Sequence, residues 1–294
     1  MISGQILVAT DFSAEADKLK DRLEELREIG LKKILLVHVL EPKLTKKIGG
    51  VSEINNKLSV LAEEYNKIGF EVETEILKGD PAEQLKELAV EENCFLILIA
   101  SHGQSFIKNV PIGHTAYKIA RQVKTPLIID KFKNYADKEF LDDNNLSNLE
   151  LMSSRIFDKI LLPLDLSSVS YKVFDLLKTL KDNIEFTEIE LLHVIESSID
   201  EEDLNQQKSD AEAEFEKLSD YLKKHGLTKN VKMKIKTGSA SEVIIEEARN
   251  EKISLVIMTK SGEDFIENKL LGSTTDTIIK HISIPVLIVP PSLY

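Results

Sequence analysis

The chain has 294 residues, of which 42% are hydrophobic, and its formal net charge is −12. This length and apolar content predict two domains, each with its own core. The acidic balance, with no cluster of lysine or arginine, disfavours nucleic acid and membrane surfaces as partners, because both attract basic patches. The longest apolar stretch, 94–100, is far shorter than the roughly 20 residues of a membrane span. These features predict a soluble cytoplasmic protein whose single cysteine, Cys94, is a buried thiol.

In the first half of the chain, short apolar runs alternate with longer amphipathic stretches, as in βαβ units around a parallel sheet. The predicted strands are 6–10, 33–40, 71–77, 95–100 and 127–129. Between the first two strands, apolar residues recur every three or four positions and predict a helix. Its buried face would carry Ala16, Leu19, Leu23 and Leu26. Asp80 to Glu83 is a capping box that predicts the start of another helix.

Residues 134–154 interrupt both periodicities, and 137–150 hold five acidic side chains against one lysine. This composition is typical of a linker. We therefore predict a first domain over 1–133 and a second over 155–294.

The second half of the chain repeats the first, which indicates a tandem duplication. The aspartates Asp11 and Asp165 are 154 positions apart, and the histidines His38 and His193 are 155 apart. Later matches keep a constant separation of 159, in the pairs Gly79 and Gly238, Gly103 and Gly262, Gly113 and Gly272, and Pro126 and Pro285. The sequence thus predicts two tandem, doubly wound α/β domains, each with a mostly parallel five-stranded sheet.

A glycine pattern follows the predicted fourth strand of each copy. In the second copy, nine residues separate Gly262 from Gly272-Ser273-Thr274, and in the first copy nine separate Gly103 from Gly113-His114-Thr115. A phosphate chain lying on a loop needs backbone N–H groups within reach, and a β-carbon would obstruct that approach or forbid positive φ. The pattern therefore points to phosphate binding beyond the carboxyl ends of the strands.

These glycine loops, the strand-one aspartates, the His-Val pairs and the closing strands introduced by proline together resemble the universal stress protein (UspA) family. Its ATP-binding members have G-x-x-G, nine residues, then G-S/T at this place. The resemblance covers nearly all of both copies and implies an adenine nucleotide alpha hydrolase-like, Rossmann-like fold. It also implies an intramolecular pseudo-dimer that pairs strand 127–129 with strand 286–289, and a further homodimer of the tandem chain. Pro126 and Pro285 at the strand starts are typical of edge strands.

By the same resemblance, Asp165 would bind the ribose side of ATP, the backbone at Val194 the adenine, and Gly262, Gly272 and Ser273 the phosphates, with or without Mg²⁺. The expected nucleotide-binding residues of the second copy are Pro163, Leu164, Asp165, Val194, Met258, Thr259, Gly262, Gly272, Ser273 and Thr274. The counterparts in the first copy, a weaker site, are Thr10, Asp11, Val39, Ala100, Gly103, Gly113 and His114.

Departures from the family pattern favour the second copy as the working site. Ala100 and Thr259 occupy the first glycine position, and threonine would be strained there if the site needs positive φ. His114 replaces the hydroxyl residue that would meet a phosphate. Alternatives stay open: the aspartates could serve only the helix caps that follow them, and the glycines could be ordinary turn residues.

The resulting hypothesis is an ATP-binding stress-response or regulatory protein without fast catalysis. A nucleotide-free scaffold with decayed sites is the alternative, because both copies depart from the pattern. A slow ATPase is a third hypothesis, although the sequence lacks a Walker loop and Lys260 is the only lysine in the segment Thr259-Lys-Ser-Gly262 of the expected phosphate loop. No catalytic or metal-binding residue is predicted.

Overall fold

The computed structural model describes residues 4–41, 50–102, 112–131, 155–181, 186–196, 201–260 and 271–291. The first copy contains β1 (Gln5–Ala9), α1 (Ala14–Asp17), α2 (Leu19–Glu28), β2 (Lys33–Leu40), α3 (Gly50–Lys67), β3 (Glu71–Lys78), α4 (Pro81–Glu91), β4 (Leu96–Ala100), α5 (His114–Gln122) and β5 (Leu127–Asp130). The second copy contains β6 (Lys159–Pro163), α7 (Lys172–Leu180), β7 (Glu188–Ile195), α8 (Glu201–Lys224), β8 (Val231–Thr237), α9 (Ala240–Asn250), β9 (Leu255–Thr259), α10 (Ser273–His281) and β10 (Val286–Val289).

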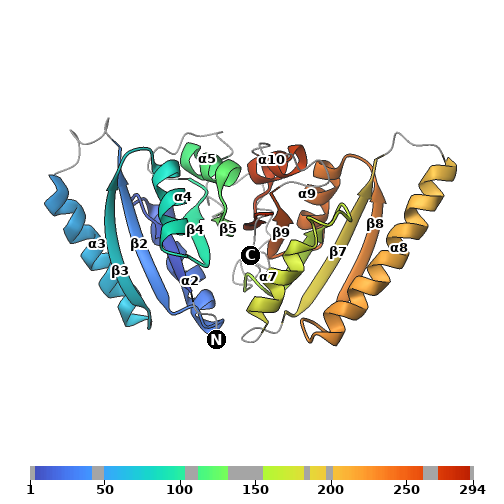
Figure 1. Cartoon of the computed structure of the whole chain (residues 1–294), viewed down its shortest axis with the longest axis horizontal. Coiled ribbons are helices and arrows are strands. Elements are labelled where there is room, and N and C mark those ends of the chain that lie inside the picture. Colours follow the sequence, from blue (N-terminus) through green and yellow to red (C-terminus); the bar gives the residue numbers. More distant parts are fainter. Residues whose placement is uncertain are drawn as a thin grey trace, which may run out of the picture.

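The strands of both copies join into one open sheet of ten strands, in the order β3-β2-β1-β4-β5-β10-β9-β6-β7-β8 (Figure 1). Pairing is parallel within each copy and antiparallel between β5 and β10, where Leu127 lies opposite Ile288. The predicted pairing of the two closing strands is therefore confirmed.

The prediction that Pro126 and Pro285 mark edge strands is wrong, because β5 and β10 lie in the middle of the joined sheet. Both prolines come just before the first residue of their strand, so no ladder N–H is lost. Their carbonyls contribute instead, accepting hydrogen bonds from Ile97 at 2.8 Å and Val256 at 3.2 Å.

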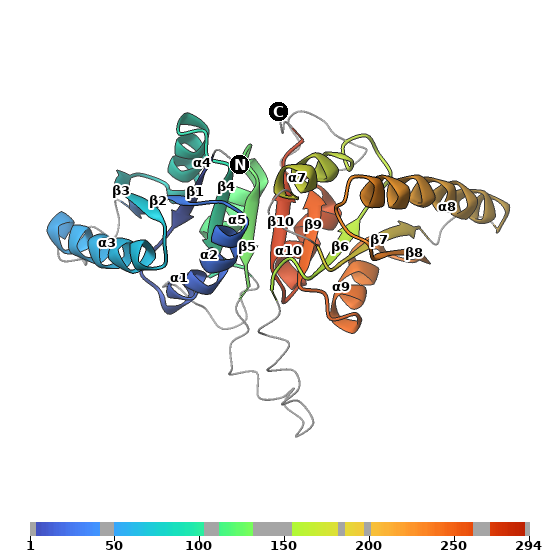
Figure 2. The same ribbon diagram turned by 90° about the horizontal axis from the view of Figure 1, so that it is seen from below.

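Helices cover both faces of the sheet, and each face has its own core (Figure 2). One core takes its helical residues from α2, α3, α7 and α8, and the other from α4, α5, α9 and α10. Successive residues of a strand enter alternate cores, as Leu7 and Val8 do, since strand side chains alternate between faces. Cys94 is buried in the second core, and burial raises the pKa of its thiol to about 12.

Local details differ from the predictions at two places. The helix predicted across Ala16 and Leu26 is split at Lys18 into α1 and α2, although its apolar residues are all buried as expected. The predicted linker, 134–154, lies outside the described residues, so the domain limits stay a prediction.

Candidate functional site

The two aspartates that follow the first strand of each copy hold the same tight turn. The Oδ1 atom of Asp165 accepts hydrogen bonds from the N–H and hydroxyl of Ser167, at 3.0 and 2.7 Å. Asp11 accepts from the N–H of Ser13 at 3.1 Å. Ser13, rather than Asp11, caps the helix that follows, since its hydroxyl accepts from Ala16 N–H. The aspartates therefore shape the turn and are not themselves the caps.

This turn is strained in both copies. Phe12 has φ of 58° and Leu166 has φ of 61°, a left-handed conformation that non-glycine residues rarely adopt. Such strain costs of order 1–3 kcal/mol and is typical of positions whose geometry the surrounding fold fixes. Both copies keep this conformation, although the residue is phenylalanine in the first and leucine in the second.

His38 of β2 and His193 of β7 each form a hydrogen bond to the backbone just after the neighbouring strand, β1 or β6. Their Nδ1 atoms each lie 2.8 Å from a carbonyl oxygen, that of Thr10 in the first copy and Leu164 in the second. A carbonyl can only accept, so Nδ1 carries the hydrogen in both rings. Both histidines are therefore hydrogen-bonded parts of the fold.

Gly113 and Gly272 begin α5 and α10 in ordinary extended conformations, with φ of −65° and −69°. Positive φ is therefore not the reason for these glycines. Gly113 instead lies so close to Ser101 that a β-carbon would come within 3.0 Å of the Ser101 carbonyl oxygen. Thr259 ends strand β9 and is absent from the positive-φ residues among those described, so its β-branch causes no strain.

A hollow of about 410 Å³ lies at the carboxyl edge of the second copy, between the starts of α9 and α10. Its lining residues are Glu196, Gly238, Ser239, Ala240, Ser241, Ser273, Thr274 and Thr277. The N-cap residues Ser239 and Gly272 make no side-chain cap bond, so among the described residues the first N–H groups of both helices lack this cap. Two helix dipoles thus bring partial positive charge to a hollow rich in hydroxyl groups.

In the first copy an ion pair crosses the corresponding space. Lys118 Nζ lies 2.7 Å from Asp80 Oδ2, which joins α5 to the start of α4. The corresponding residues of the second copy, 159 positions later, are Thr277 and Ser239. Asp80 also caps α4, accepting from Ala82 and Glu83, and the hydrogen bond from Lys118 lowers the pKa of its carboxyl. Asp80 therefore caps α4 as predicted, whereas Ser239 makes no cap bond to α9.

The predicted residues of the second copy that the structure describes gather at the carboxyl ends of three neighbouring strands, β9, β6 and β7, and at the start of α10. Ser273 and Thr274 also line the hollow. The other described members, Pro163, Leu164, Asp165, Val194, Met258, Thr259 and Gly272, lie outside its lining. Thr10, Asp11, Val39, Ala100, Gly113 and His114 occupy the corresponding places in the first copy, while Gly103 and Gly262 lie outside the described residues.

The sequence prediction missed Glu196, Ser239, Ser241 and Thr277 as lining residues. A signal existed for the serines, because Ser239 to Glu242 has the spacing of a capping box, as Asp80 to Glu83 has in the first copy. Glu196 follows β7 and Thr277 lies in α10, and only the tertiary structure brings both beside the start of α9, which sequence spacing does not reveal.

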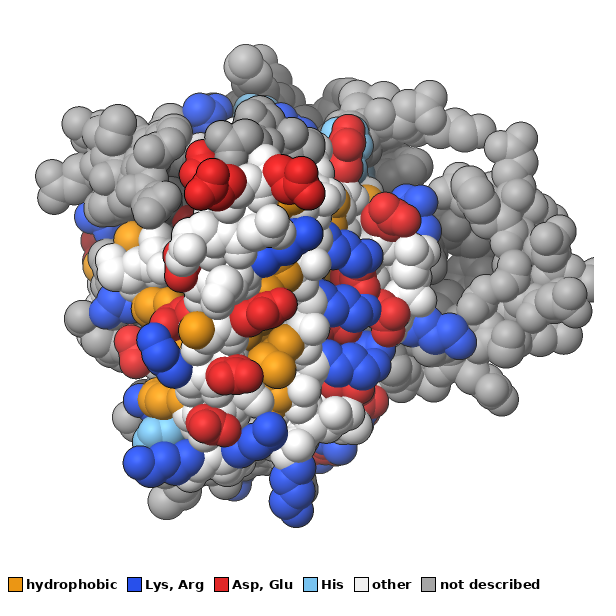
Figure 3. Space-filling view, turned by 90° about the vertical axis from the view of Figure 1, so that its right-hand side faces the viewer, with side chains coloured by type: hydrophobic (Ala, Val, Ile, Leu, Met, Phe, Trp, Pro, Cys, Tyr) orange, Lys and Arg blue, Asp and Glu red, His pale blue; other side chains and the backbone are white. Residues whose placement is uncertain are grey.

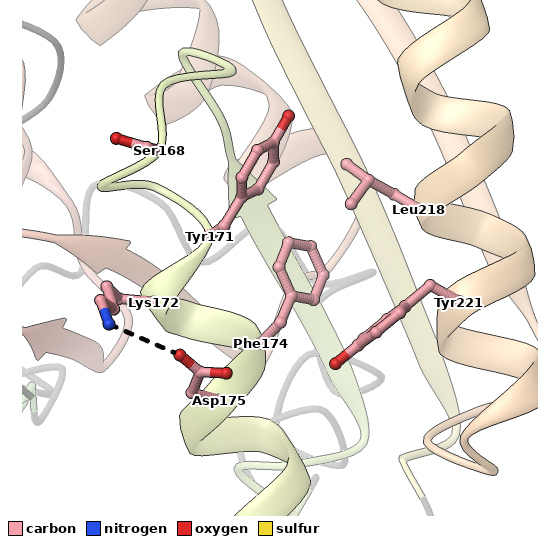
Figure 4. A pocket seen from close by; sticks show the side chains of 7 residues that line it. All are labelled: Ser168, Tyr171, Lys172, Phe174, Asp175, Leu218 and Tyr221. Atoms are coloured by element: carbon pink, nitrogen blue, oxygen red, sulfur yellow. Dashed lines mark ion pairs between the residues drawn. The ribbon is translucent and has the colours of Figure 1, made fainter. Parts of the chain in front are cut away.

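A second hollow, of about 280 Å³, lies between α7 and α8 and touches none of the predicted residues. Figure 4 shows its aromatic wall, formed by Tyr171 and Phe174 at the start of α7 and Tyr221 of α8. The rings of Phe174 and Tyr221 meet edge to face at 6.0 Å. This wall is part of the helix packing on that face of the sheet.

Within the described ranges, no group of three or more His, Cys, Asp or Glu residues could hold a metal ion. No described helix is long and apolar enough to cross a membrane.

The fold and the repeated strand-end turns define a tandem, doubly wound α/β protein with a hollow at its carboxyl edge. The family model described as "Universal stress protein family" matches residues 3–131 and 156–290. The chain therefore belongs to the universal stress protein family.

Known proteins that are similar to this chain include other members of the family. Universal stress protein MJ0577 of Methanocaldococcus jannaschii is 24% identical over 155 residues, which cover 44% of this chain and 96% of that protein. The structure of a universal stress protein from Archaeoglobus fulgidus has a TM-score of 0.69 at 20% identity, covering 99% of this chain and all of that one. A universal stress protein solved in complex with cAMP is 23% identical, with a TM-score of 0.35, over 43% of this chain and 93% of that one.

Proposed function

We propose that the second copy binds an adenine nucleotide, with ATP as its ligand, and that the protein is a stress-response regulator without fast catalysis. The observation that carries this proposal is the hollow between α9 and α10, where two uncapped helix starts meet among hydroxyl side chains. Backbone N–H groups at helix starts bind phosphate without any lysine. An acidic protein can therefore hold a nucleotide at this place.

The polar groups of the site suit different parts of the ligand. Ser273 and Thr274, with the first N–H groups of α10, would hold phosphate oxygens. Glu196 is a carboxylate, which accepts hydrogen bonds, and so it would face the sugar or base rather than the phosphates. Following the family resemblance, Asp165 would bind the ribose side and the backbone at Val194 the adenine.

The ion pair in the first copy provides a matched test in the whole chain. The double variant Ser239→Asp/Thr277→Lys gives the second copy the residues that form the ion pair in the first, and should close the hollow. Wild-type protein should melt several degrees higher with excess magnesium ATP, because ligand at a hundred times Kd adds about 2.7 kcal/mol. The double variant should lose most of this rise in Tm.

The control is Asp80→Ser/Lys118→Thr, which changes the same two positions in the first copy. Its melting temperature should rise with ATP as the wild type does. Titration calorimetry should give about one nucleotide per wild-type chain. If neither melting nor titration of the wild type responds to millimolar ATP, the proposal is wrong, and the nucleotide-free scaffold becomes the better hypothesis.

Three further properties remain proposals that the family assignment supports: domain limits at 1–133 and 155–294, a homodimer of the tandem chain, and location in the cytoplasm. Size-exclusion chromatography with light scattering would test the homodimer directly, since a chain of 33.1 kDa should then elute at twice that mass.

A further inference from the structure

Two lysines from different copies come together at the junction of the sheet. Lys124 precedes β5, whose first residue, Leu127, lies opposite Ile288 of β10. Lys260 follows β9, and its N–H donates a 3.0 Å hydrogen bond to the carbonyl of Val289 in β10. The chain before β5 therefore lies beside the end of β9.

Lys124 and Lys260 form a small region of positive charge. Lys124 is exposed and Lys260 is half-buried. Burial lowers the pKa of the Lys260 ammonium, and the positive charge of Lys124 lowers it further. In the part of the chain that the structure describes, neither lysine has an ion pair.

The lysine pair lies where α10 begins. Gly272 N–H donates a 3.0 Å hydrogen bond to the carbonyl of Lys260, so the first turn of α10 starts directly beside this residue. A phosphate group held by that first turn would lie close to Lys260, and the charge of Lys124 reaches the same place. Ammonium groups are point charges that suit phosphate oxygens.

The first copy lacks this arrangement. The positions that correspond to Lys260 and Lys124, 159 residues away in each case, are Ser101 and Ser283. Ser101 instead places its hydroxyl 3.0 Å from His102 Nδ1. The positive pair thus occurs beside the start of α10 and not at the corresponding place beside α5.

We propose that Lys124 of the first copy and Lys260 of the second together bind the phosphate tail of the nucleotide, so that the second copy's site is built from both copies. This inference rests on the proposed function. A site built in this way makes the protein selective for nucleotides with long phosphate tails. The bound ligand would contact both copies across the junction between β5 and β10.

The test compares ATP with adenosine by titration calorimetry on the full chain. Lys124→Met keeps the apolar stem and removes the charge, so it should weaken ATP binding on the order of tenfold. Adenosine has no phosphate, and its affinity should change less than about twofold. The control is Lys32→Met, because Lys32 is also exposed but precedes β2, three strands away from β5 in the sheet. It should leave both affinities unchanged.

The outcomes separate this inference from the proposed function. If the wild type binds ATP and Lys124→Met binds it equally well, the composite site is wrong while nucleotide binding stands. Equal weakening of ATP and adenosine would also overturn it, because the lysine would then act on the fold and not on the phosphates. If the wild type binds neither ligand, the proposed function itself fails.

Discussion

Gly113 shows how a single close contact dictates a residue type. Its N–H donates a 2.7 Å hydrogen bond to the carbonyl of Ser101, which brings the two backbones together at the start of α5. A β-carbon at this position would lie 3.0 Å from that same oxygen, closer than such atoms normally approach. Because the obstruction is backbone, no side-chain rotation relieves it.

We expect Gly113→Ala to lower the free energy of unfolding by about 1–3 kcal/mol, the range of overpacking in a rigid setting. Urea denaturation, followed by circular dichroism, measures the change. Thr115→Ala on the same helix serves as the control and should stay within about 0.5 kcal/mol of the wild type. An unchanged urea midpoint for Gly113→Ala would contradict this prediction, because the backbone at Ser101 would then move away without loss of stability.

At the level of elements, the second copy contains an ionic network where the first has apolar packing. Glu190 of β7 and Glu247 of α9 are buried and both pair with Lys234 of β8. The residues of the first copy at the two glutamate positions are Leu35 and Leu88, both buried. Figure 3 shows lysine and acidic side chains intermingled at this end of the molecule.

Replacing Lys234 should lower the free energy of unfolding more than replacing Glu190 and Glu247 together. Lys234→Met removes the lysine that pairs with Glu190 and leaves Glu247 with Lys236, so it should destabilise the protein by about 3 kcal/mol. Glu190→Leu/Glu247→Leu restores the leucines of the first copy, and Lys234 still has Glu251 at 3.0 Å. Its stability should stay within about 1 kcal/mol of the wild type or exceed it. Calorimetric melting of the three proteins would check this order, and the reverse order would contradict it.

The ionic network also predicts how the stability of the protein depends on pH. Hydrogen bonds from Lys234 and then Lys159 lower the pKa of Glu251 from 4.5 to about 2. A carboxylate with a lowered pKa stabilises the fold above its unfolded pKa, and this contribution is lost as pH falls from 4.5 towards 2. Burial raises the pKa of Glu190 in the folded protein, so the protonation of this residue favours the fold as pH falls. Melting temperatures between about pH 5 and 3 should therefore fall less steeply in Lys234→Met than in the wild type.

For the whole molecule, duplication has allowed the two copies to differ where they meet. Tyr117 of α5 and Asp276 of α10 occupy corresponding positions, 159 residues apart, and they contact each other. The Tyr117 hydroxyl donates a 2.7 Å hydrogen bond to Asp276 Oδ1. Lys280 pairs with Asp276 at 2.6 Å and lies 4.8 Å above the Tyr117 ring. If the two copies had the same sequence, the two residues that meet here would be of the same type. Two copies of the second sequence would bring aspartate against aspartate.

Exchanging the two residues tests this pairing. Tyr117→Asp alone brings two carboxylates together and should lower the free energy of unfolding by about 1–2 kcal/mol. Adding Asp276→Tyr should recover most of the loss, because it removes one of the two facing carboxylates and supplies a tyrosine hydroxyl that can donate to the other. The remaining carboxylate, at position 117, also lies four residues before Arg121, as Asp276 lies before Lys280. Equal stability of the single and double variants in urea would show that the hydrogen bond does not matter.

The amino-acid sequence by itself determined the duplication and the alternation of strands and helices, while the pairing of β5 with β10 was expected only from the family resemblance. Strand and helix periodicity are local properties, and a repeated pattern makes each of them visible twice. Tertiary structure decided that the closing strands lie at the centre of the sheet, and that Lys118 meets Asp80 in the first copy while Ser239 and Thr277 face a hollow in the second. These contacts join side chains far apart in the chain, and they form only because helix packing brings those side chains together.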